Sequence, residues 1–391
     1  MQAFEDELHR RLASLDELGR RRRLEVASPE LDGLDFASND YLGLAHDPHF
    51  AARVRARIEA SSCASSPASR LLRGQTALHA ELEQRLAAFK GTEAALLMPS
   101  GFQANVGLLS SIIDRRDRVL SDRLNHASLI DGLRLSKAEV IIYPHLQTEA
   151  VEQALAEPWP GRTFVVTESL FSMDGDIAPL ERLADLCEHH GALLIVDDAH
   201  ATGLWGQRGS GLLEALGLER RVLAITSTFG KSFAAAGAFI AGSHKLIDYL
   251  VNACRPFIFT TAISPLLCHA VLAGLEIIAE EPERRRRVHD NAARLRLHLR
   301  RAGLDTPPGE GPIVPVVLGS EERALSVAAE LRRSGFDVRA VRPPTVPAGS
   351  SRLRLSIHAN HDPGQIDALA SRLVAAMRTI EREETTVGEL L

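Results

Sequence analysis

Cysteine is scarce in this sequence, with four residues among 391, and no two of them stand in CxxC spacing. A disulfide framework or a structural zinc centre needs clustered cysteines, so the sequence favours neither. We expect reduced and mostly buried thiols, as in a cytoplasmic protein. The four residues are Cys63, Cys187, Cys254 and Cys268.

Long apolar runs are also missing. No stretch reaches the length that spans a bilayer, and the first residues are charged (Glu5–Glu7), which is unlike a secretory signal. The formal net charge of -6 disfavours nucleic acid or an anionic membrane as the main partner. One basic run, Arg20–Arg23, has a solvated helix end as its simplest interpretation. These features predict a cytoplasmic protein with neither nucleic acid nor membrane as partner.

The remaining composition is that of a globular protein, with 45% hydrophobic and 25% charged residues. The length exceeds what one hydrophobic core supports, so at least two domains are expected. No Pro- or Gly-rich linker marks a boundary. We predict an N-terminal helix and segment (1–50), a large domain (51–264) and a small C-terminal domain (265–391).

Short apolar runs separated by helical stretches fill the predicted large domain. Near-continuous apolar runs are typical of strands buried on both faces of a parallel sheet, and their alternation with helices predicts a doubly wound α/β architecture. In such sheets ligands bind at the carboxyl ends of the strands. The runs are Ala94–Met98, Val140–Tyr143, Phe164–Thr167, Leu193–Val196, Val222–Thr226 and Ala238–Ala241.

The C-terminal part has a different texture. An Arg-rich helical stretch (Glu283–Arg301) precedes a predicted strand at Ile313–Leu318 and a second one at Arg352–Ile357. Helical patterns lie around Ala324–Ser334 and from Pro363 onward. This sequence predicts a smaller α+β domain, with the N-terminal segment packing beside it.

Three sets of polar residues follow the apolar runs. Gly101 opens a helix after the first run, where free N–H groups suit a phosphate, although such turns are common. Asp197, Asp198 and His200 follow the fourth run; they fit helix capping with a salt bridge, a metal site, or a carboxylate that keeps a heterocyclic nitrogen protonated. Lys231 follows the fifth run in apolar surroundings that favour a nucleophilic neutral amine.

Asp197 and Lys231 therefore end neighbouring strands, which is the arrangement a pyridoxal-phosphate (PLP) site requires. At this point the sequence resembles the α-oxoamine synthases, a family of fold-type I PLP-dependent transferases, from about Asn39 to the C-terminus. Such a fold has a large domain with a mostly parallel seven-stranded sheet. The resemblance rests on seven ordered segments, at residues 39–44, 100–102, 125–128, 171–176, 197–200, 228–231 and 343–347.

The resemblance implies a role for each matching residue. Lys231 would carry the cofactor as a Schiff base and shuttle the α-proton, Asp197 would pair with the ring nitrogen, and His126 would stack on the ring and contact substrate. Arg354 would bind the substrate carboxylate, a bidentate task that suits guanidinium. Further cofactor contacts are expected from Gly101, Phe102, Ser172, His200 and Thr228, and further substrate contacts from Thr345 and Arg21.

Within the family, the resemblance is closest to enzymes that condense L-alanine with a pimeloyl thioester, of CoA or acyl carrier protein, in biotin biosynthesis. It also implies a homodimer, with Phe257–Thr261 reaching the neighbouring subunit. Other members join glycine or serine to a different acyl-CoA, and these remain alternatives, as does a metal-dependent hydrolase. A catalytically silent scaffold subunit would lack the lysine or the aspartate, and both are present here.

Two segments depart from the family pattern. After Lys231 the family usually has glycines, whereas this chain has Ser232–Ala236 before Gly237. Arg73 stands where a smaller residue usually precedes the glycine. We expect both departures to affect loop packing or the acyl channel, and neither to affect the chemistry.

Overall fold

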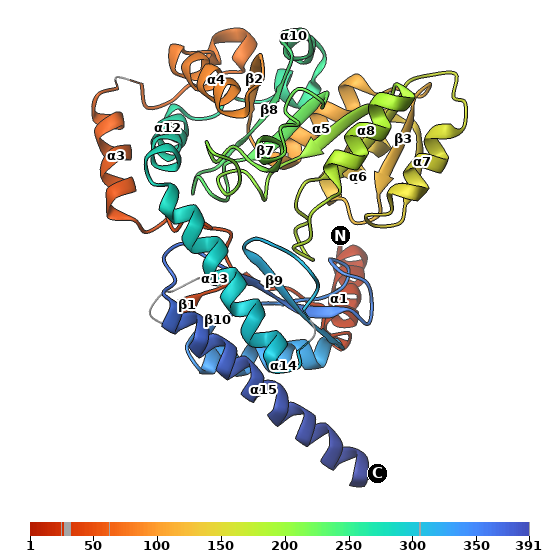
Figure 1. Cartoon of the computed structure of the whole chain (residues 1–391), viewed down its shortest axis with the longest axis vertical. Helices are drawn as coiled ribbons and strands as arrows, with labels where there is room; N and C mark the ends of the chain where they lie inside the picture. Colours follow the sequence, from red (N-terminus) through yellow and green to blue (C-terminus); the bar gives the residue numbers. More distant parts are fainter. Residues whose placement is uncertain (25, 27–32, 62, 305, 391) are drawn as a thin grey trace. The chain divides into compact units, whose positions relative to one another are not determined.

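The computed structural model describes residues 1–24, 26, 33–61, 63–304 and 306–390. The chain forms two compact units (Figure 1). The larger contains Asn39–Ser172 and Asp176–Val288, and the smaller contains Met1–Ser38, Met173–Gly175 and His289–Leu391. The division falls inside helix α13 (Pro282–Arg301). These limits differ from the three segments expected from the sequence, which remain a prediction.

The larger unit contains a seven-stranded sheet in the order β2-β8-β7-β6-β5-β3-β4. β8 runs antiparallel to both of its neighbours, and all other pairs are parallel. The α/β fold class and the mostly parallel sheet are therefore confirmed. The strands are β2 (Ala94–Met98), β3 (Arg118–Asp122), β4 (Glu139–Tyr143), β5 (Thr163–Glu168), β6 (Leu193–Asp197), β7 (Ala224–Thr228) and β8 (Ala238–Gly242).

Strand β3 is the one that the apolar runs did not reveal. Only Val119 and Leu120 are apolar in it, and charged residues stand at both ends. Those ends are nevertheless buried, because Arg118 donates to the Thr163 hydroxyl and Asp122 accepts from His145. A central strand that satisfies its buried charges with distant partners leaves no hydrophobic signal in the local sequence.

Helices cover the sheet of the larger unit (Figure 1). α5, α6, α10 and α11 share one apolar cluster with the strands, and Leu108, Leu133 and Leu250 are central to it. This cluster fixes α5 across the sheet. The helices are α3 (Pro48–Glu59), α4 (Ala77–Lys90), α5 (Gly101–Ile112), α6 (Ala127–Ser136), α7 (Thr148–Ala156), α8 (Leu180–His190), α9 (Leu212–Ala215), α10 (His244–Ala253), α11 (Arg255–Ile258) and α12 (Pro265–Glu280), with a π-helical turn η1 (Arg70–Gly74).

The smaller unit is an α+β structure built on an antiparallel sheet in the order β11-β12-β9. The N-terminal segment joins it, because β1 pairs in parallel with β10. The elements are α1 (Gln2–Glu17), β1 (Leu34–Asp35), α13, β9 (Ile313–Gly319), α14 (Glu321–Arg333), β10 (Phe336–Asp337), β11 (Ala340–Val341), β12 (Ser351–Ser356) and α15 (Pro363–Leu390).

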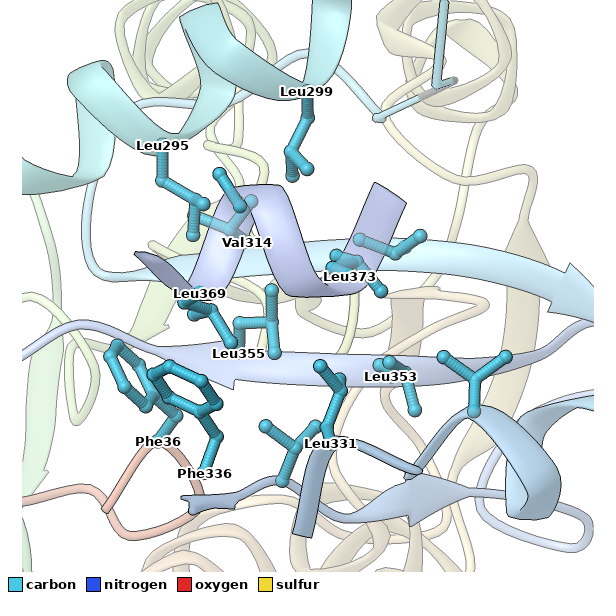
Figure 2. Close-up of a cluster of buried hydrophobic side chains, with 14 of the residues drawn as sticks. Phe36, Leu295, Leu299, Val314, Leu331, Phe336, Leu353, Leu355, Leu369 and Leu373 are labelled. Atoms are coloured by element: carbon cyan, nitrogen blue, oxygen red, sulfur yellow. The ribbon is translucent and has the colours of Figure 1, made fainter. Parts of the chain in front are cut away.

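The core of this unit lies between the helices and strands β9 and β12. Figure 2 shows Leu295 and Leu299 of α13 and Leu369 of α15 directed toward Val314 and Leu355 on the strands. All five side chains are fully buried. Burial of a leucine stabilises a fold by about 2 kcal/mol, so this cluster holds the sheet and its helices together.

The apolar residues of α1 do not join that core. Phe4, Leu12 and Leu15 are exposed, and the helix buries none of its residues within the chain. In the described part of the sequence, no helix combines the length and the apolarity that crossing a membrane requires.

Candidate active site

Asp197 and Lys231 lie at the carboxyl ends of two adjacent parallel strands. Asp197 is the last residue of β6 and pairs in register with Thr226 of β7. Lys231 follows the end of β7, in the loop that leads to β8. Because parallel strands end at the same edge of a sheet, both residues belong to the edge where ligands bind in α/β proteins.

The Asp197 carboxylate is held by two donors. Asn105 Nδ2, on α5, donates to Oδ2 at 2.7 Å, and the backbone N–H of Ala199 donates to Oδ1 at 2.9 Å. Charge-assisted bonds of this kind stabilise an ionised carboxylate and fix its direction. Asn105 has the one polar side chain among the residues that α5 buries, and the sequence analysis gave it no role.

Asp198 has unlike surroundings, although it is the next residue. It is fully buried, and its carboxylate pairs with Lys90 Nζ at 2.7 Å and accepts from Ser169 Oγ at 2.6 Å. Burial lowers the pKa of Lys90, and the charge of Asp198 opposes that shift. This pair joins α4 to the end of β6, so the charge of Asp198 is balanced inside the fold.

The loop that carries Lys231 is anchored on both sides. Phe229 and Phe233 are fully buried and meet edge to face, with their centroids 5.5 Å apart. Ser232 Oγ donates to the carbonyl of Thr202 at 2.7 Å. Lys231 itself is half-buried between these anchors, which hold its backbone in place.

The predicted phosphate contacts lie together at the start of α5. The first-turn N–H groups of Gly101 and Phe102 have no acceptor within the helix. A Cβ on Gly101 would lie 3.5 Å from Thr228 Cβ, an ordinary van der Waals distance, so the helix start and this threonine are direct neighbours. Thr228 Oγ1 donates to the carbonyl of Gly237 at 3.0 Å. Helix-start amides with a neighbouring hydroxyl make a suitable anion site.

Two histidines are held by named partners. His126 caps α6, and its Nδ1 lies 2.7 Å from Ser128 Oγ. Burial and the charge of Lys231 lower the pKa of His126, against the opposing effect of Asp197. His200 is buried, and its Nδ1 lies 2.7 Å from the hydroxyl of Tyr41. The predicted contact Ser172 lies half-buried in the loop after β5.

Glu168, a residue that the sequence analysis did not single out, lies in the same cluster. It ends β5 in register with Asp197, it is 3% exposed, and its Oε1 has no hydrogen-bond partner among the described residues. Burial, followed by the charge of Asp197, raises its pKa to about 8, against the effect of Lys231. Its place directly after the apolar run Phe164–Thr167 was the signal that could have found it.

The other predicted substrate residues lie in the smaller unit. Arg354, on β12, is buried and donates from Nη1 to Ser356 Oγ at 2.9 Å. Thr345 Oγ1 accepts from Arg22 at 3.0 Å, whereas Arg21 forms an ion pair with Asp16 at 2.6 Å. Among the four successive arginines, the structure therefore joins Arg22, and not Arg21, to Thr345.

The side chains at the strand ends of the larger unit, together with the start of α5, fit PLP chemically. It offers an amine at Lys231, a fixed carboxylate at Asp197 for a ring nitrogen, and helix-start amides for a phosphate. The buried Oε1 of Glu168, at the end of the neighbouring strand β5, is a further polar atom that has no hydrogen-bond partner in the described part of the chain. No group of three or more His, Cys, Asp or Glu side chains in the described ranges is placed to hold a metal ion.

Comparison with known proteins also points to a PLP-dependent enzyme. The family profile "Aminotransferase class I and II" matches residues 32–373. An 8-amino-7-oxononanoate synthase of Anaeromyxobacter dehalogenans is 48% identical over 378 residues, covering 94% of each chain, and one of Chlorobaculum parvum is 46% identical, covering 93% of this chain and 94% of the relative.

Solved structures agree as well. A serine palmitoyltransferase from S. paucimobilis with bound PLP has a TM-score of 0.89 at 31% identity, covering 97% of this chain and 99% of the other. An 8-amino-7-oxononanoate synthase from Francisella tularensis has a TM-score of 0.76 at 26% identity, covering 90% and 99%. Together with the site, these similarities establish PLP as the cofactor of this chain.

Proposed function

The chain belongs to the aminotransferase class I and II family, as a PLP-dependent acyltransferase of the 8-amino-7-oxononanoate synthase type, and from this premise we propose that it condenses L-alanine with a pimeloyl thioester. The products would be 8-amino-7-oxononanoate, carbon dioxide and the free thiol. The pathway is biotin biosynthesis. The observation that carries the proposal is the placement of Asp197 and Lys231 at adjacent strand ends.

PLP, when bound, supplies an electron sink for negative charge that develops at the α-carbon of an amino acid. The residues of the chain prepare for this chemistry. Asp197, held by Asn105 and Ala199, would keep a proton on the ring nitrogen. Gly101, Phe102 and Thr228 would bind the phosphate, while His126, His200 and Ser172 would orient the ring.

Lys231 would have two tasks. It would bind the cofactor when no substrate is present, and its free amine would then take the proton from the α-carbon of alanine. An amine in partly apolar surroundings is a suitable base for this purpose, because desolvation favours its neutral form. The anchored loop around Phe229 and Phe233 would hold it at a constant distance from the reacting carbon.

The bonds of the overall reaction balance. The Cα–H bond of alanine breaks, a bond forms from this carbon to the acyl carbonyl carbon, and the thiol leaves with a proton. The original carboxyl group departs as carbon dioxide, and a proton replaces it at the same carbon. The Arg354 guanidinium would bind that carboxylate beforehand, and Thr345 with Arg21 or Arg22 would contact the substrate.

We also infer a homodimer. Phe259, in the segment that the family uses to reach its neighbour, is 71% exposed in the single chain, although Phe257 is buried. Leu72, within η1, is 84% exposed. Large apolar side chains that protrude in this way are typical of surfaces covered by a partner.

A second candidate is the condensation of serine with palmitoyl-CoA. It is suggested by the serine palmitoyltransferase, which gives the higher TM-score of the two solved structures, 0.89 against 0.76. The sequence favours the first proposal, since identity reaches 48% with a synthase and 31% with the palmitoyltransferase. Backbone similarity reports the shared family, whereas side chains determine which substrate is bound.

The test is a substrate panel. Thiol release would be measured with alanine, glycine and serine, each against pimeloyl, acetyl, succinyl and palmitoyl thioesters of CoA, and with pimeloyl acyl carrier protein. We expect the largest kcat/KM for alanine with a pimeloyl thioester. A preference for serine with palmitoyl-CoA, or for glycine with a short acyl-CoA, would replace the proposal with the corresponding reaction.

A further inference from the structure

A continuous series of hydrogen bonds connects His126 with Asp197 in the larger unit. Ser128 Oγ lies 2.7 Å from His126 Nδ1, and Asn105 Nδ2 donates to Ser128 Oγ at 2.9 Å and to Asp197 Oδ2 at 2.7 Å. Asn105 Oδ1 accepts from the Thr226 hydroxyl at 2.7 Å. Asn105, Ser128 and Thr226 are all buried, so water does not replace these bonds.

Which atom donates in each of these hydrogen bonds follows from Asp197, the acceptor at one end of the series. An ionised Asp197 can only accept, so the amide of Asn105 must present its NH₂ group there, which leaves its oxygen for Thr226. The second N–H of the same NH₂ group points at Ser128 Oγ. Since Ser128 Oγ accepts this bond, its own hydrogen is available for His126 Nδ1.

Nδ1 of His126 has a second donor. The backbone N–H of Ser128 reaches it at 3.2 Å, in the geometry of a side-chain cap at the start of α6. Two donors therefore converge on this nitrogen. A proton on Nδ1 would point at the hydrogens of these two donors and would break both hydrogen bonds. The arrangement therefore favours a lone pair on Nδ1 and a hydrogen on Nε2.

We propose that Asn105 and Ser128 are positioning residues that keep His126 as a neutral imidazole with its proton on Nε2. The proposal rests on the PLP site proposed above, because its benefit concerns the cofactor. A charged imidazolium beside Asp197 would compete with the ring nitrogen for the same carboxylate. A neutral imidazole leaves that carboxylate to the cofactor and still offers a flat face for the ring.

The titratable groups around His126 come from three other elements. Asp197 on β6 favours the imidazolium, and Lys231 in the loop after β7 opposes it. The Glu168 carboxyl on β5 accepts from the backbone N–H of His126. Burial and Lys231 prevail over Asp197, so the pKa of His126 is lowered, in agreement with the hydrogen-bond directions.

The experiment is NMR on the full chain, labelled with ¹⁵N at histidine and free of cofactor. Long-range ¹H–¹⁵N correlations distinguish the two tautomers, and a His126→Gln spectrum assigns the signal. We expect the Nε2–H form at neutral pH. His145, which lies between Asp122 and Asp176 with its pKa raised to about 9, should appear charged in the same spectrum as an internal reference.

Ser128→Ala removes one donor to Nδ1. We expect a shift of about fivefold in the tautomer ratio toward Nδ1–H, the factor that one ordinary hydrogen bond supplies, and a higher pKa of His126. Ser128→Thr keeps the hydroxyl and should restore the signal. Ser136→Ala is the matched control, because it removes a buried hydroxyl bond at the other end of α6.

A His126 that is charged or carries its proton on Nδ1 in the unmodified chain at neutral pH would overturn the proposal. An unchanged tautomer ratio and titration in Ser128→Ala would do so too. Because no cofactor is present, these outcomes are independent of the proposed reaction. That reaction fails separately, if the loaded enzyme releases no thiol with any amino acid.

Discussion

At the scale of single residues, Asp197 and Asp198 show how neighbours of the same type are given different tasks. Asp197 accepts two hydrogen bonds at the ligand-binding edge, whereas Asp198 is enclosed with Lys90. The sequence predicted a role for Asp197 from its position at a strand end beside that of Lys231, and the family resemblance then gave the same residue. The buried partner of Asp198 lies 108 residues away in the chain and could not be predicted locally.

Substituting each acid separates the two roles. Asp197→Asn removes the charge that would hold a proton on the cofactor ring, and we expect α-proton exchange of alanine in D₂O to slow by about a hundredfold, or ~3 kcal/mol. Asp198→Asn leaves the charge of Lys90 buried without its partner, which costs about 3–5 kcal/mol of stability. NMR exchange rates and thermal unfolding of both variants measure this. Loss of exchange in a folded Asp198→Asn, with exchange retained in Asp197→Asn, would reverse the assignment.

Glu168 predicts a pH dependence of stability. Its pKa of about 8 in the folded chain lies above the ordinary 4.5, because burial favours the protonated carboxyl. Its contribution to the free energy of unfolding is therefore complete below pH 4.5 and is lost as pH rises through 8. Glu168→Gln mimics the protonated form and lacks this loss. As pH rises from 4.5 to 8, we expect the free energy of unfolding of the unmodified protein to fall by on the order of 4 kcal/mol relative to that of the variant. Chemical denaturation without cofactor checks this, and a constant difference across that range would contradict it.

At the scale of elements, the loop after β7 shows a cost of the unusual sequence around Lys231. Ala234 has φ of +46°, in the left-handed region that glycine adopts without strain. The departure from the usual glycines was visible in the sequence. Which of the alanines would carry the strain was not, because that depends on the anchoring of Phe229 and Phe233.

Ala234→Gly should therefore raise the free energy of unfolding by about 0.5–1 kcal/mol. Ala236→Gly is the matched control, because residue 236 has no positive φ and the substitution there should lower the stability slightly. Denaturant titrations of the two variants give the comparison. Equal losses in both would show that the loop is not strained at Ala234.

The connection between β3 and the loop after β5 depends on one histidine. His145 lies 2.8 Å from both Asp122 and Asp176. Burial is the largest single effect and lowers its pKa, but the two carboxylates outweigh it and raise the pKa to about 9. Because the folded value lies above the ordinary 6.5, the stabilisation is complete below pH 6.5 and is lost as pH rises through 9.

His145→Asn should remove that dependence. The unmodified protein should lose on the order of 3 kcal/mol more than the variant between pH 6.5 and 10, as measured by denaturation at fixed salt. Parallel stability curves over this interval would show that the histidine is not charged in the folded chain.

At the scale of the whole molecule, the sequence predicted the fold class because buried strands alternate with helices from Ala94 to Ala241. It could not predict β3, whose apolar signal is two residues long, or Arg22, which the structure joins to Thr345. The sequence alone does not distinguish which of four successive arginines contacts a distant residue. Only the backbone direction after α1 distinguishes them.

The exposed Phe259 and Leu72 predict self-association. We expect light scattering to give the mass of two chains, and Phe259→Asp to weaken the dimer because a charge cannot be buried in an apolar interface without a partner. Activity should fall together with the dimer fraction. A fully active monomer would contradict the homodimer.

Lysine mapping tests the central claim most directly. The chain has four lysines, namely Lys90, Lys137, Lys231 and Lys245, so a cofactor fixed by borohydride reduction can be located by mass spectrometry without ambiguity. We predict a yellow protein whose colour is bleached by borohydride, with one cofactor per chain attached to Lys231 and none in Lys231→Ala. A reduced cofactor on Lys137 or Lys245, or a protein that binds no PLP, would contradict the account.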